Sequence, residues 1–299
     1  MLFYLYYFNF SFINVPQRII IIGAKGMLGQ ELVETYQEDT FNQVYAWDFD
    51  DIDITQEKAV QKKIKAVDPN VVINAAAYNA VDKAEENEGP KAAMAVNAEG
   101  PKNIAEACKK VGAVFATYSS DYVFRGDKEE GYREDDKPDP VSKYGKSKFA
   151  GEKNVQKIGG KYFIIRTSKL FGKVGTGKDV KKSFVDTMIE LSDKLPELKV
   201  VDEEVSCFTY TPDLAKATRL ILEGNYPEGI YHITNTKPCT WYGCAKSIFE
   251  ILGKDIKITP VPASTFPRPA KRPQFSILIN TKMPPIRSYK EALKEFLIG

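Results

Sequence analysis

Two short segments carry side chains whose types and spacing suit acid-base chemistry. Ser120 ends an apolar, β-branched run, and 24 residues later come Tyr144 and, four positions on, Lys148. Four residues are about one helical turn and Ser142 is a suitable N-cap, so the phenol and the ammonium are expected on one helix face. A nearby ammonium favours the phenolate, which lowers the pKa of a tyrosine towards the range useful for proton transfer. Ser120, at the carboxyl end of a strand, is placed to polarise a carbonyl.

A second segment has the glycine spacing of a dinucleotide-binding loop. Gly23, Gly26 and Gly29 follow the apolar run at 18–22 directly and lead into a helical pattern. A diphosphate binds over a helix N-terminus, where free N–H groups and the positive end of the helix dipole point at it. A side chain at the closest approach would exclude the phosphates. The segment therefore predicts a dinucleotide site.

The cofactor type is left open by two residues near this loop. Asp48 lies 19 residues beyond Gly29, where a carboxylate binds an adenosine ribose and repels a 2′-phosphate, which favours NAD. Lys25 inside the loop either attracts a 2′-phosphate or is a solvated loop charge. The expected cofactor is NADH or NADPH, with NADH binding at least as well.

The pattern around these segments is that of an α/β fold. Short β-branched runs alternate with helix-spaced apolar positions, and the runs are nearly all apolar, as in strands with helices on both faces of the sheet. We expect a right-handed, doubly wound parallel sheet of the Rossmann-like type with a smaller α+β substrate-binding lobe. The expected strands are 18–22, 43–47, 70–75, 113–119 and 161–167, and the expected helices are 27–37, 55–66, 90–111 and 142–158.

The regular alternation loosens after about residue 170, which suggests a division of the chain. Residues 1–17 form an apolar N-terminal extension, and 18–168 the dinucleotide-binding domain, with a return segment at about 198–222. Residues 169–197 and 223–299 form the substrate-binding lobe.

Residues 1–15 are aromatic and apolar but too short to span a bilayer, which takes about 20 residues. They also lack the basic region and cleavage site of a signal peptide. Three interpretations stay open: an over-extended translation start, an added edge strand or partner-binding arm, and a membrane-surface anchor.

Composition narrows the classes of function. The 42 basic and 40 acidic residues of this 299-residue chain give a net charge of +2, so nucleic acid is not an expected partner. His232 is the single histidine, which excludes a multi-histidine metal cluster, and no metal is expected. Cys108, Cys207, Cys239 and Cys244 form no CxxC pair, so we interpret them as free thiols in a cytoplasmic protein.

From about Arg18 to its C-terminus, the chain resembles the extended short-chain dehydrogenase/reductase superfamily and, more narrowly, the dTDP-4-dehydrorhamnose reductase family. Besides the glycine loop and YGKSK (144–148), the resemblance is carried by NAAAYNAVDKAE (74–85), VNAEG (96–100), YSSDYVF (118–124), KFAGE (148–152), RTS (166–168), YHITN (231–235) and RPQFS (272–276).

The resemblance implies reduction of a 4-keto nucleotide sugar by NADH or NADPH, namely of dTDP-4-dehydro-L-rhamnose to dTDP-L-rhamnose. Hydride would pass to C4 while Tyr144 delivers the proton. Ser120, Tyr144 and Lys148 would be the catalytic set, and Lys148 would also hold the nicotinamide ribose. The expected cofactor contacts are Gly23, Lys25, Gly26, Met27, Leu28, Asp48, Asp53, Ile54, Ala77, Tyr78, Asn79, Tyr118, Tyr144 and Lys148, and the expected substrate contacts are Ser120, Asp121 and Lys169.

This sequence departs from the family's pattern at three places in the sugar-nucleotide region. The tryptophan after RTS is Lys169, an asparagine is Ser183, and a Gly-x-Pro-Thr segment is replaced at 206–209. Lys169 can meet a diphosphate as a point charge but supplies no aromatic face.

Two other kinds of function stay open. One is another short-chain reductase or epimerase acting on a nucleotide sugar. A 4,6-dehydratase is disfavoured, because Asp121 is followed by Tyr122 and not by glutamate. The other is a non-catalytic regulatory subunit similar to the β subunit of methionine adenosyltransferase. No membrane span is expected, and a homodimer is left open.

Overall fold

The computed structural model describes residues 16–177 and 180–299, so the interpretations of residues 1–15 lie outside the described residues. Its centre is a six-stranded, fully parallel sheet. The strands are, in spatial order, β2 (Gln43–Trp47), β1 (Arg18–Ile22), β3 (Val71–Asn74), β4 (Val114–Ser120), β5 (Tyr162–Thr167) and β10 (Gly229–His232). The chain reverses direction across the sheet between β1 and β3, which is where open α/β sheets bind ligands.

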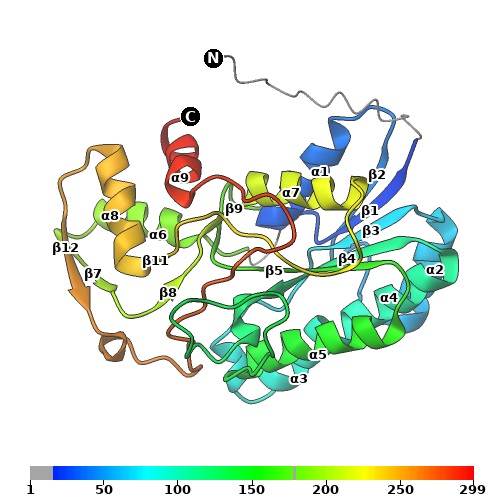
Figure 1. Cartoon of the computed structure of the whole chain (residues 1–299), viewed down its shortest axis with the longest axis horizontal. Coiled ribbons are helices and arrows are strands. Elements are labelled where there is room, and N and C mark those ends of the chain that lie inside the picture. The colour runs from blue at the N-terminus through cyan, green and yellow to red at the C-terminus, as the bar shows by residue number, and fades with distance from the viewer. Residues whose placement is uncertain (1–15, 178–179) are drawn as a thin grey trace, which may run out of the picture.

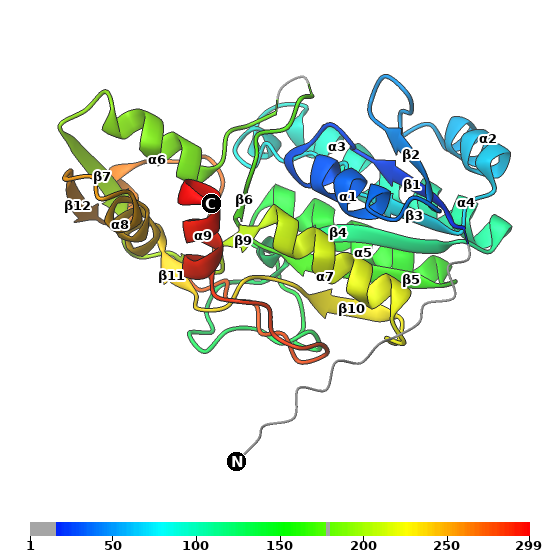
Figure 2. The same cartoon turned by 90° about the horizontal axis from the view of Figure 1, so that it is seen from above.

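Helices cover both faces of this sheet, which confirms the doubly wound fold (Figure 1). Alternate residues of β1 serve the two layers: Ile19 and Ile21 pack against one pair of helices, and Ile20 and Ile22 against three others. The first layer contains α1 (Met27–Gln37) and α7 (Thr211–Glu223), and the second α2 (Glu57–Val67), α4 (Gly100–Val111) and α5 (Lys143–Ile158). Figure 2 shows α1 and α7 side by side above the strands.

The expected helix at 90–111 is interrupted. It consists of α3 (Gly89–Met94), the π-helical segment η2 (Ala95–Glu99) and α4. Pro101, in the first turn of α4, has no N–H to donate to a preceding helical turn, so the regular hydrogen-bond pattern is interrupted there. Segments of π-helix often lie at functional sites. The remaining short helical segments are η1 (Lys83–Glu85), η3 (Asp121–Val123) and η4 (Ala263–Thr265).

The second lobe has its own apolar core, separate from the two layers of the main sheet (Figure 1, left). Its elements are β6 (Leu170–Phe171), α6 (Phe184–Ser192), β7 (Glu197–Val201), β8 (Val205–Ser206), β9 (Thr209–Tyr210), β11 (Cys239–Thr240), α8 (Trp241–Leu252), β12 (Lys257–Val261) and α9 (Tyr289–Ile298). They include three two-stranded sheets, β7 with β12, β8 with β11, and β6 with β9.

The return to the main sheet differs from the expected segment at 198–222. The run at 198–205 does not join that sheet, because β7 pairs with β12 in the lobe. Within the expected segment only α7 returns, where it packs on α1, and the chain then adds β10, which pairs with β5. The return therefore covers residues 211–232.

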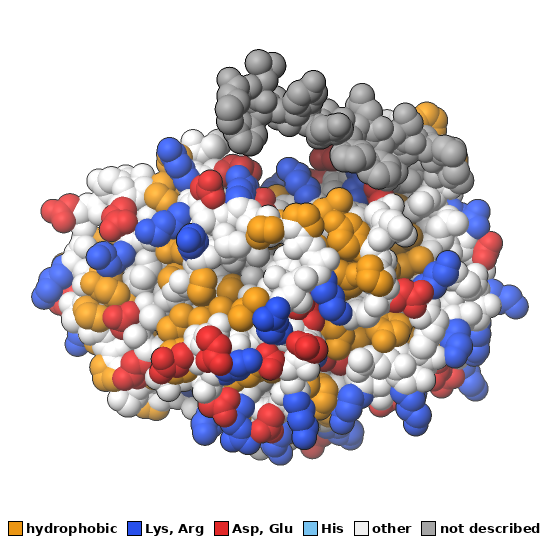
Figure 3. All heavy atoms as spheres, in the orientation of Figure 1, with side chains coloured by type: hydrophobic (Ala, Val, Ile, Leu, Met, Phe, Trp, Pro, Cys, Tyr) orange, Lys and Arg blue, Asp and Glu red, His pale blue; other side chains and the backbone are white. Residues whose placement is uncertain are grey.

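The length of the helices and the distribution of charged side chains describe the outside of the molecule. No helix within residues 16–177 and 180–299 is long and apolar enough to cross a membrane. On the face drawn in Figure 3, basic and acidic side chains are interspersed, with hydrophobic side chains between them.

Candidate functional site

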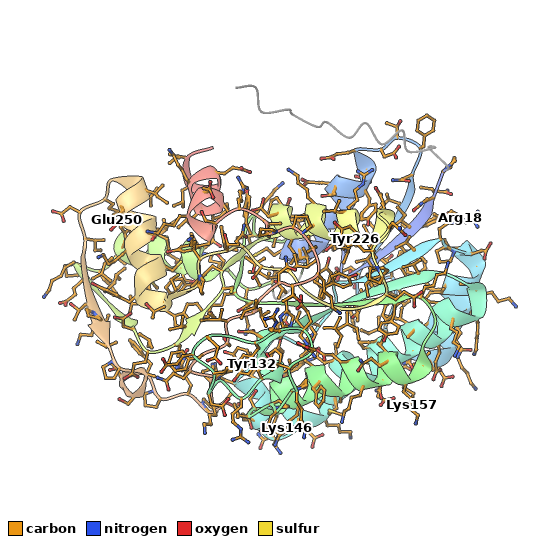
Figure 4. All side chains as sticks on the ribbon, in the orientation of Figure 1. Arg18, Tyr132, Lys146, Lys157, Tyr226 and Glu250 are labelled. Carbon is orange, nitrogen blue, oxygen red and sulfur yellow. The ribbon has the colours of Figure 1, made fainter. Side chains whose placement is uncertain are left out.

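Helix α5 positions the two residues expected to handle the proton. The Ser142 hydroxyl accepts a hydrogen bond from the Gly145 N–H at 3.0 Å, so the predicted cap starts the helix. Tyr144 and Lys148 follow one turn apart, and both side chains are buried. The Lys148 Nζ donates to the Tyr118 carbonyl at 2.8 Å, which fixes the ammonium at the carboxyl end of β4. In Figure 4, Lys146 marks the end of α5 that points towards the lobe.

The Tyr144 phenol lies in a largely apolar pocket. Its ring meets Tyr122 edge-on at 5.6 Å between centroids, and its hydroxyl is 3.5 Å from the Asn79 Oδ1. Burial raises the pKa of Tyr144, and a hydrogen bond with the Ser120 hydroxyl opposes this only in part. The lowering expected from Lys148 is therefore not what the site shows. Tyr144 keeps its proton at neutral pH, which suits a general acid.

A buried ion pair that had not been assigned from the sequence lies one turn along α5 from Lys148. Glu152 lies one turn further along α5 and binds the Arg166 guanidinium of β5 through two hydrogen bonds of 2.9 and 2.7 Å. Both side chains are only 1% exposed. Burial lowers the pKa of Lys148 to about 8, and the Glu152 charge opposes that shift. In the sequence, the KFAGE and RTS motifs contain Glu152 and Arg166 and were the features that could have indicated this pair.

Asp121 is the centre of a second buried cluster. Its carboxylate accepts hydrogen bonds from three serine hydroxyls, Ser120 at 2.9 Å, Ser168 at 2.8 Å and Ser276 at 2.6 Å. Burial raises the pKa of Asp121, and the serine hydrogen bonds oppose the shift. The cluster brings together the SSD, RTS and RPQFS segments and orients the Ser120 hydroxyl beside Tyr144.

The glycine loop lies at the turn from β1 into α1. Gly23 has φ +81°, and a Cβ there would come within 2.7 Å of the Ala76 nitrogen, so glycine is required at this position. Gly26 is the N-cap of α1 and no side chain caps the helix, so the N–H groups of Met27 and Leu28 remain available to phosphate oxygens. These features fit a dinucleotide diphosphate.

A loop from the lobe, residues 173–177, lies over this glycine loop. The Gly177 N–H donates to the Lys25 carbonyl at 3.1 Å. A Cβ on Gly175 would meet the Lys25 carbonyl oxygen and would lie 2.9 Å from the Met27 nitrogen. The Gly/Lys-rich composition of this stretch does not by itself indicate a role.

The residues expected near the adenosine half of the cofactor already have protein partners. The Asp48 carboxylate accepts from the Lys25 N–H at 2.9 Å and from the Phe49 N–H at 2.8 Å. The Asp53 carboxylate accepts from the Thr55 N–H at 2.9 Å and from its hydroxyl at 2.7 Å. Both carboxylates thus shape their own turns, and each keeps further lone pairs for a ribose hydroxyl.

The remaining expected contacts lie around β3, β4 and the π-helical segment. Ile54 is buried, and a Cβ on Gly100 would collide with its side chain. The loop 77–79 is held by Asn97, whose amide bonds the Tyr78 N–H at 2.9 Å and the Tyr78 carbonyl at 3.0 Å. This role of Asn97 was not predicted from the sequence, although the residue lies in the VNAEG motif.

Tyr118 turns its side chain away from α5. Its hydroxyl is 2.7 Å from the Thr218 Oγ1 on α7, so only its backbone carbonyl reaches Lys148. Lys169 is also not brought to the surface of the site. Its Nζ is buried 3.6 Å from the centroid of the Trp241 ring. Trp241 thereby supplies an aromatic side chain next to Lys169, the residue that stands where the family usually has tryptophan.

Residues 17–298 match the family described as the RmlD substrate binding domain. A dTDP-4-dehydrorhamnose reductase from Streptomyces griseus is 38% identical over 289 residues, which cover 93% of this chain and 92% of that protein.

Two solved structures are also similar. A dTDP-4-dehydrorhamnose reductase from Bacillus anthracis in complex with NADP has a TM-score of 0.88 and 36% identity, covering 95% of this chain and 99% of that one. One from Clostridium acetobutylicum has a TM-score of 0.86 and 42% identity, covering 93% and 98%.

Proposed function

The chain belongs to the RmlD substrate binding domain family, and we propose that it is a dTDP-4-dehydrorhamnose reductase. It reduces the C4 ketone of dTDP-4-dehydro-L-rhamnose to the alcohol of dTDP-L-rhamnose, with NADPH or NADH as the reductant. When bound, the nicotinamide cofactor supplies the hydride that this reduction needs.

The observation that carries the proposal is the meeting of Tyr144, Lys148 and Ser120 at the carboxyl end of β4. Because burial raises the pKa of Tyr144, its phenol is protonated and can donate to the oxygen on which negative charge develops. The Ser120 hydroxyl has a single proton, which it donates to Asp121 in this structure, and it would turn to the same oxygen as a second donor when the ketone is bound. Lys148, with a pKa of about 8, is mostly charged at neutral pH and lies one helical turn from Tyr144.

The cofactor would be held at both ends by groups of this chain. The first turn of α1 would bind the diphosphate, with the loop 173–177 lying over it. Asp48, Asp53 and Ile54 would bind the adenosine, and Ala77 to Asn79, Tyr118 and Lys148 the nicotinamide half. Ser120 and Asp121 would meet the sugar. We further propose that the reaction takes place in the cytoplasm, a setting that suits the four free thiols.

Tyr144→Phe tests the proposal, because it removes the proton donor while keeping the ring. We expect turnover of the 4-keto sugar nucleotide to fall at least ~100-fold, with nearly unchanged cofactor affinity. Reduced-cofactor absorbance follows turnover, and NMR of the product gives the configuration at C4. Tyr36→Phe is the matched control, since the buried Tyr36 hydroxyl has no hydrogen-bond partner among the described residues.

Near-normal turnover by Tyr144→Phe would remove this residue from the mechanism. If the wild-type protein binds NADPH but none of the 4-keto nucleotide sugars causes it to oxidise the cofactor, the reductase function is refuted. A binding role then remains. A panel of dTDP- and UDP-linked ketones separates a wrong sugar from a wrong reaction. Light scattering on the same preparation decides whether the protein is a homodimer.

A further inference from the structure

Residues 268–276, which we call the clasp, connect the two lobes of the molecule. Arg268 pairs with Glu204 in the second lobe, and Arg272 pairs with Asp82 in the loop that follows β3 of the main sheet. Three residues separate the two arginines, and a proline follows each of them, which restricts the backbone between the two ion pairs. The clasp therefore joins the cofactor side of the molecule to the substrate side.

The contact of Arg272 with Asp82 is bidentate and largely enclosed. The guanidinium donates to both carboxylate oxygens, at 2.9 and 2.7 Å, and the Ala270 N–H donates to the same carboxylate at 3.2 Å. The Arg272 Nη1 also donates to the Ala270 carbonyl at 2.9 Å, and its side chain is only 12% exposed. Burial raises the pKa of Asp82, but the hydrogen bonds from Arg272 and Ala270 outweigh it, so that pKa is lowered and the carboxylate is ionised.

Asp82 belongs to the turn that carries the residues expected at the nicotinamide. It lies three positions after Asn79, and the Val81 N–H donates to the Asn79 carbonyl at 3.0 Å. Two residues further on, Ala84 is fully buried in the same apolar cluster as Tyr144. A displacement of Asp82 therefore moves the turn that packs on the proton donor.

The rest of the clasp reaches the substrate side. Glu204, the partner of Arg268, also accepts a hydrogen bond from the Trp241 Nε1–H at 3.0 Å, at the first turn of α8. At the far end of the clasp, the Ser276 hydroxyl donates to the Asp121 carboxylate at 2.6 Å. Asp121 is a proposed substrate contact, so one short segment is bonded both to the turn beside the cofactor and to the substrate site.

We propose that Arg272 is a positioning residue that couples cofactor binding to sugar-nucleotide binding through its ion pair with Asp82. A dinucleotide that fixes the turn 77–82 also fixes Arg272 and the clasp, and so prepares the substrate side. By linkage, a bound sugar nucleotide raises the affinity for the dinucleotide by the same factor. Arg272 acts through Asp82 and touches neither ligand. This inference rests on the proposed function, because it concerns the order within that same site.

The test is the affinity for dTDP, the nucleotide part of the proposed substrate, measured by calorimetry without NADP⁺ and with saturating NADP⁺. We expect NADP⁺ to tighten dTDP binding at least ~5-fold in the wild type, the lower range for coupling between two sites. In Arg272→Gln this effect should disappear, because a neutral amide cannot hold both oxygens of Asp82. Arg125→Gln is the matched control. Arg125 donates to Asp139 at 2.7 Å, but both side chains are more than half exposed and lie outside the clasp, so the wild-type effect should remain.

A double-mutant cycle separates coupling from stability. Asp82→Asn should lose the effect of NADP⁺ as Arg272→Gln does, and the double variant should be no worse than either single variant. A merely structural role would lower the melting temperature and leave the effect of NADP⁺ on dTDP binding unchanged. That result in a folded variant, or a wild-type protein whose affinity for dTDP ignores NADP⁺, overturns the proposal.

The emission of Trp241 gives a readout that needs no sugar nucleotide. Trp47→Phe leaves Trp241 as the one tryptophan of the chain, and the bond of Trp241 to Glu204 makes it a reporter of the lobe end of the clasp. NADP⁺ should change this emission, and adding Arg272→Gln should abolish the change. If the change depends on Arg272 but no 4-keto nucleotide sugar is reduced, the proposed function alone is refuted. If the change is the same with Arg272→Gln, the coupling is refuted whatever the protein reduces.

Discussion

Glu152→Gln tests how the buried ion pair supports both the fold and the proton donor. The variant keeps the size of the side chain but leaves the Arg166 guanidinium without a counter-charge. Since both side chains are 1% exposed and share two hydrogen bonds of 2.9 and 2.7 Å, water cannot compensate. Removing one partner of such a pair costs about 3–5 kcal/mol. For a chain of this size, this corresponds to a melting temperature lower by about 6–10 °C.

The same substitution acts on Lys148. The negative charge of Glu152 raises the pKa of Lys148 against the effect of burial, so its loss moves that pKa below about 8. Activity that depends on a protonated lysine is then lost at lower pH, and the alkaline limb of the kcat profile shifts towards neutrality. Calorimetry measures the first effect and turnover against pH the second.

Glu190→Gln is the control for this experiment. Glu190 also bonds two cations, Lys182 at 2.7 Å and Lys194 at 2.6 Å, but on the surface, where such pairs contribute little. We expect its melting temperature and pH profile to stay at the wild-type values. A loss in Glu152→Gln no larger than in this control would refute the argument from burial, and an unshifted alkaline limb would refute the coupling to Lys148.

Three further predictions concern the cofactor loop and pH. Gly175→Ala should weaken NADPH binding about 10-fold, because its Cβ meets the Lys25 carbonyl oxygen and lies 2.9 Å from the Met27 nitrogen, and such an overlap costs about 1–3 kcal/mol; Gly177→Ala, with contacts of 3.2 Å or more, should lose much less in the same fluorescence titration. NADH should bind at least as well as NADPH; a strong NADPH preference would show that Lys25 binds a 2′-phosphate in spite of Asp48. Burial and the neighbouring Arg166 lower the pKa of His232 from 6.5 to about 4. The unfolded chain therefore binds a proton at His232 more readily than the folded chain, and the stability that neutral His232 contributes is complete only above pH 6.5. This contribution, about 3 kcal/mol, is lost as pH falls from 6.5 to 4, and unfolding titrations of wild type and His232→Gln should converge there.

Much of the sheet and half of the site follow from local pattern. The strands at 18–22 and 43–47 and the helix at 27–37 have the predicted bounds, because each is a short apolar period between clear turns. Tyr144 and Lys148 meet because the helix period brings positions four apart together and Ser142 starts the helix. The types and spacing of neighbouring residues were therefore enough to predict these elements and this pair.

The run at 198–205 shows where local pattern fails. Its apolar residues, Leu198, Val200, Val201 and Val205, are too few to distinguish a strand of the main sheet from a strand of a small separate sheet. Its partner decides, and β12 contains Pro260, which cannot donate a ladder hydrogen bond and suits a two-stranded sheet. Nothing within 198–205 encodes that pairing, so the start of the return to the main sheet was placed too early.

Electrostatic partners are hidden from the sequence for a related reason. Asp121 and Ser276 are separated by 155 positions, and Glu152 and Arg166 by 14, yet each pair shares a hydrogen bond. The pKa of Tyr144 was expected to fall because Lys148 is near in sequence, but the direction is set by how deeply the fold buries the phenol. Spacing along a helix can name the reacting groups, whereas their protonation depends on neighbours that only the folded chain supplies.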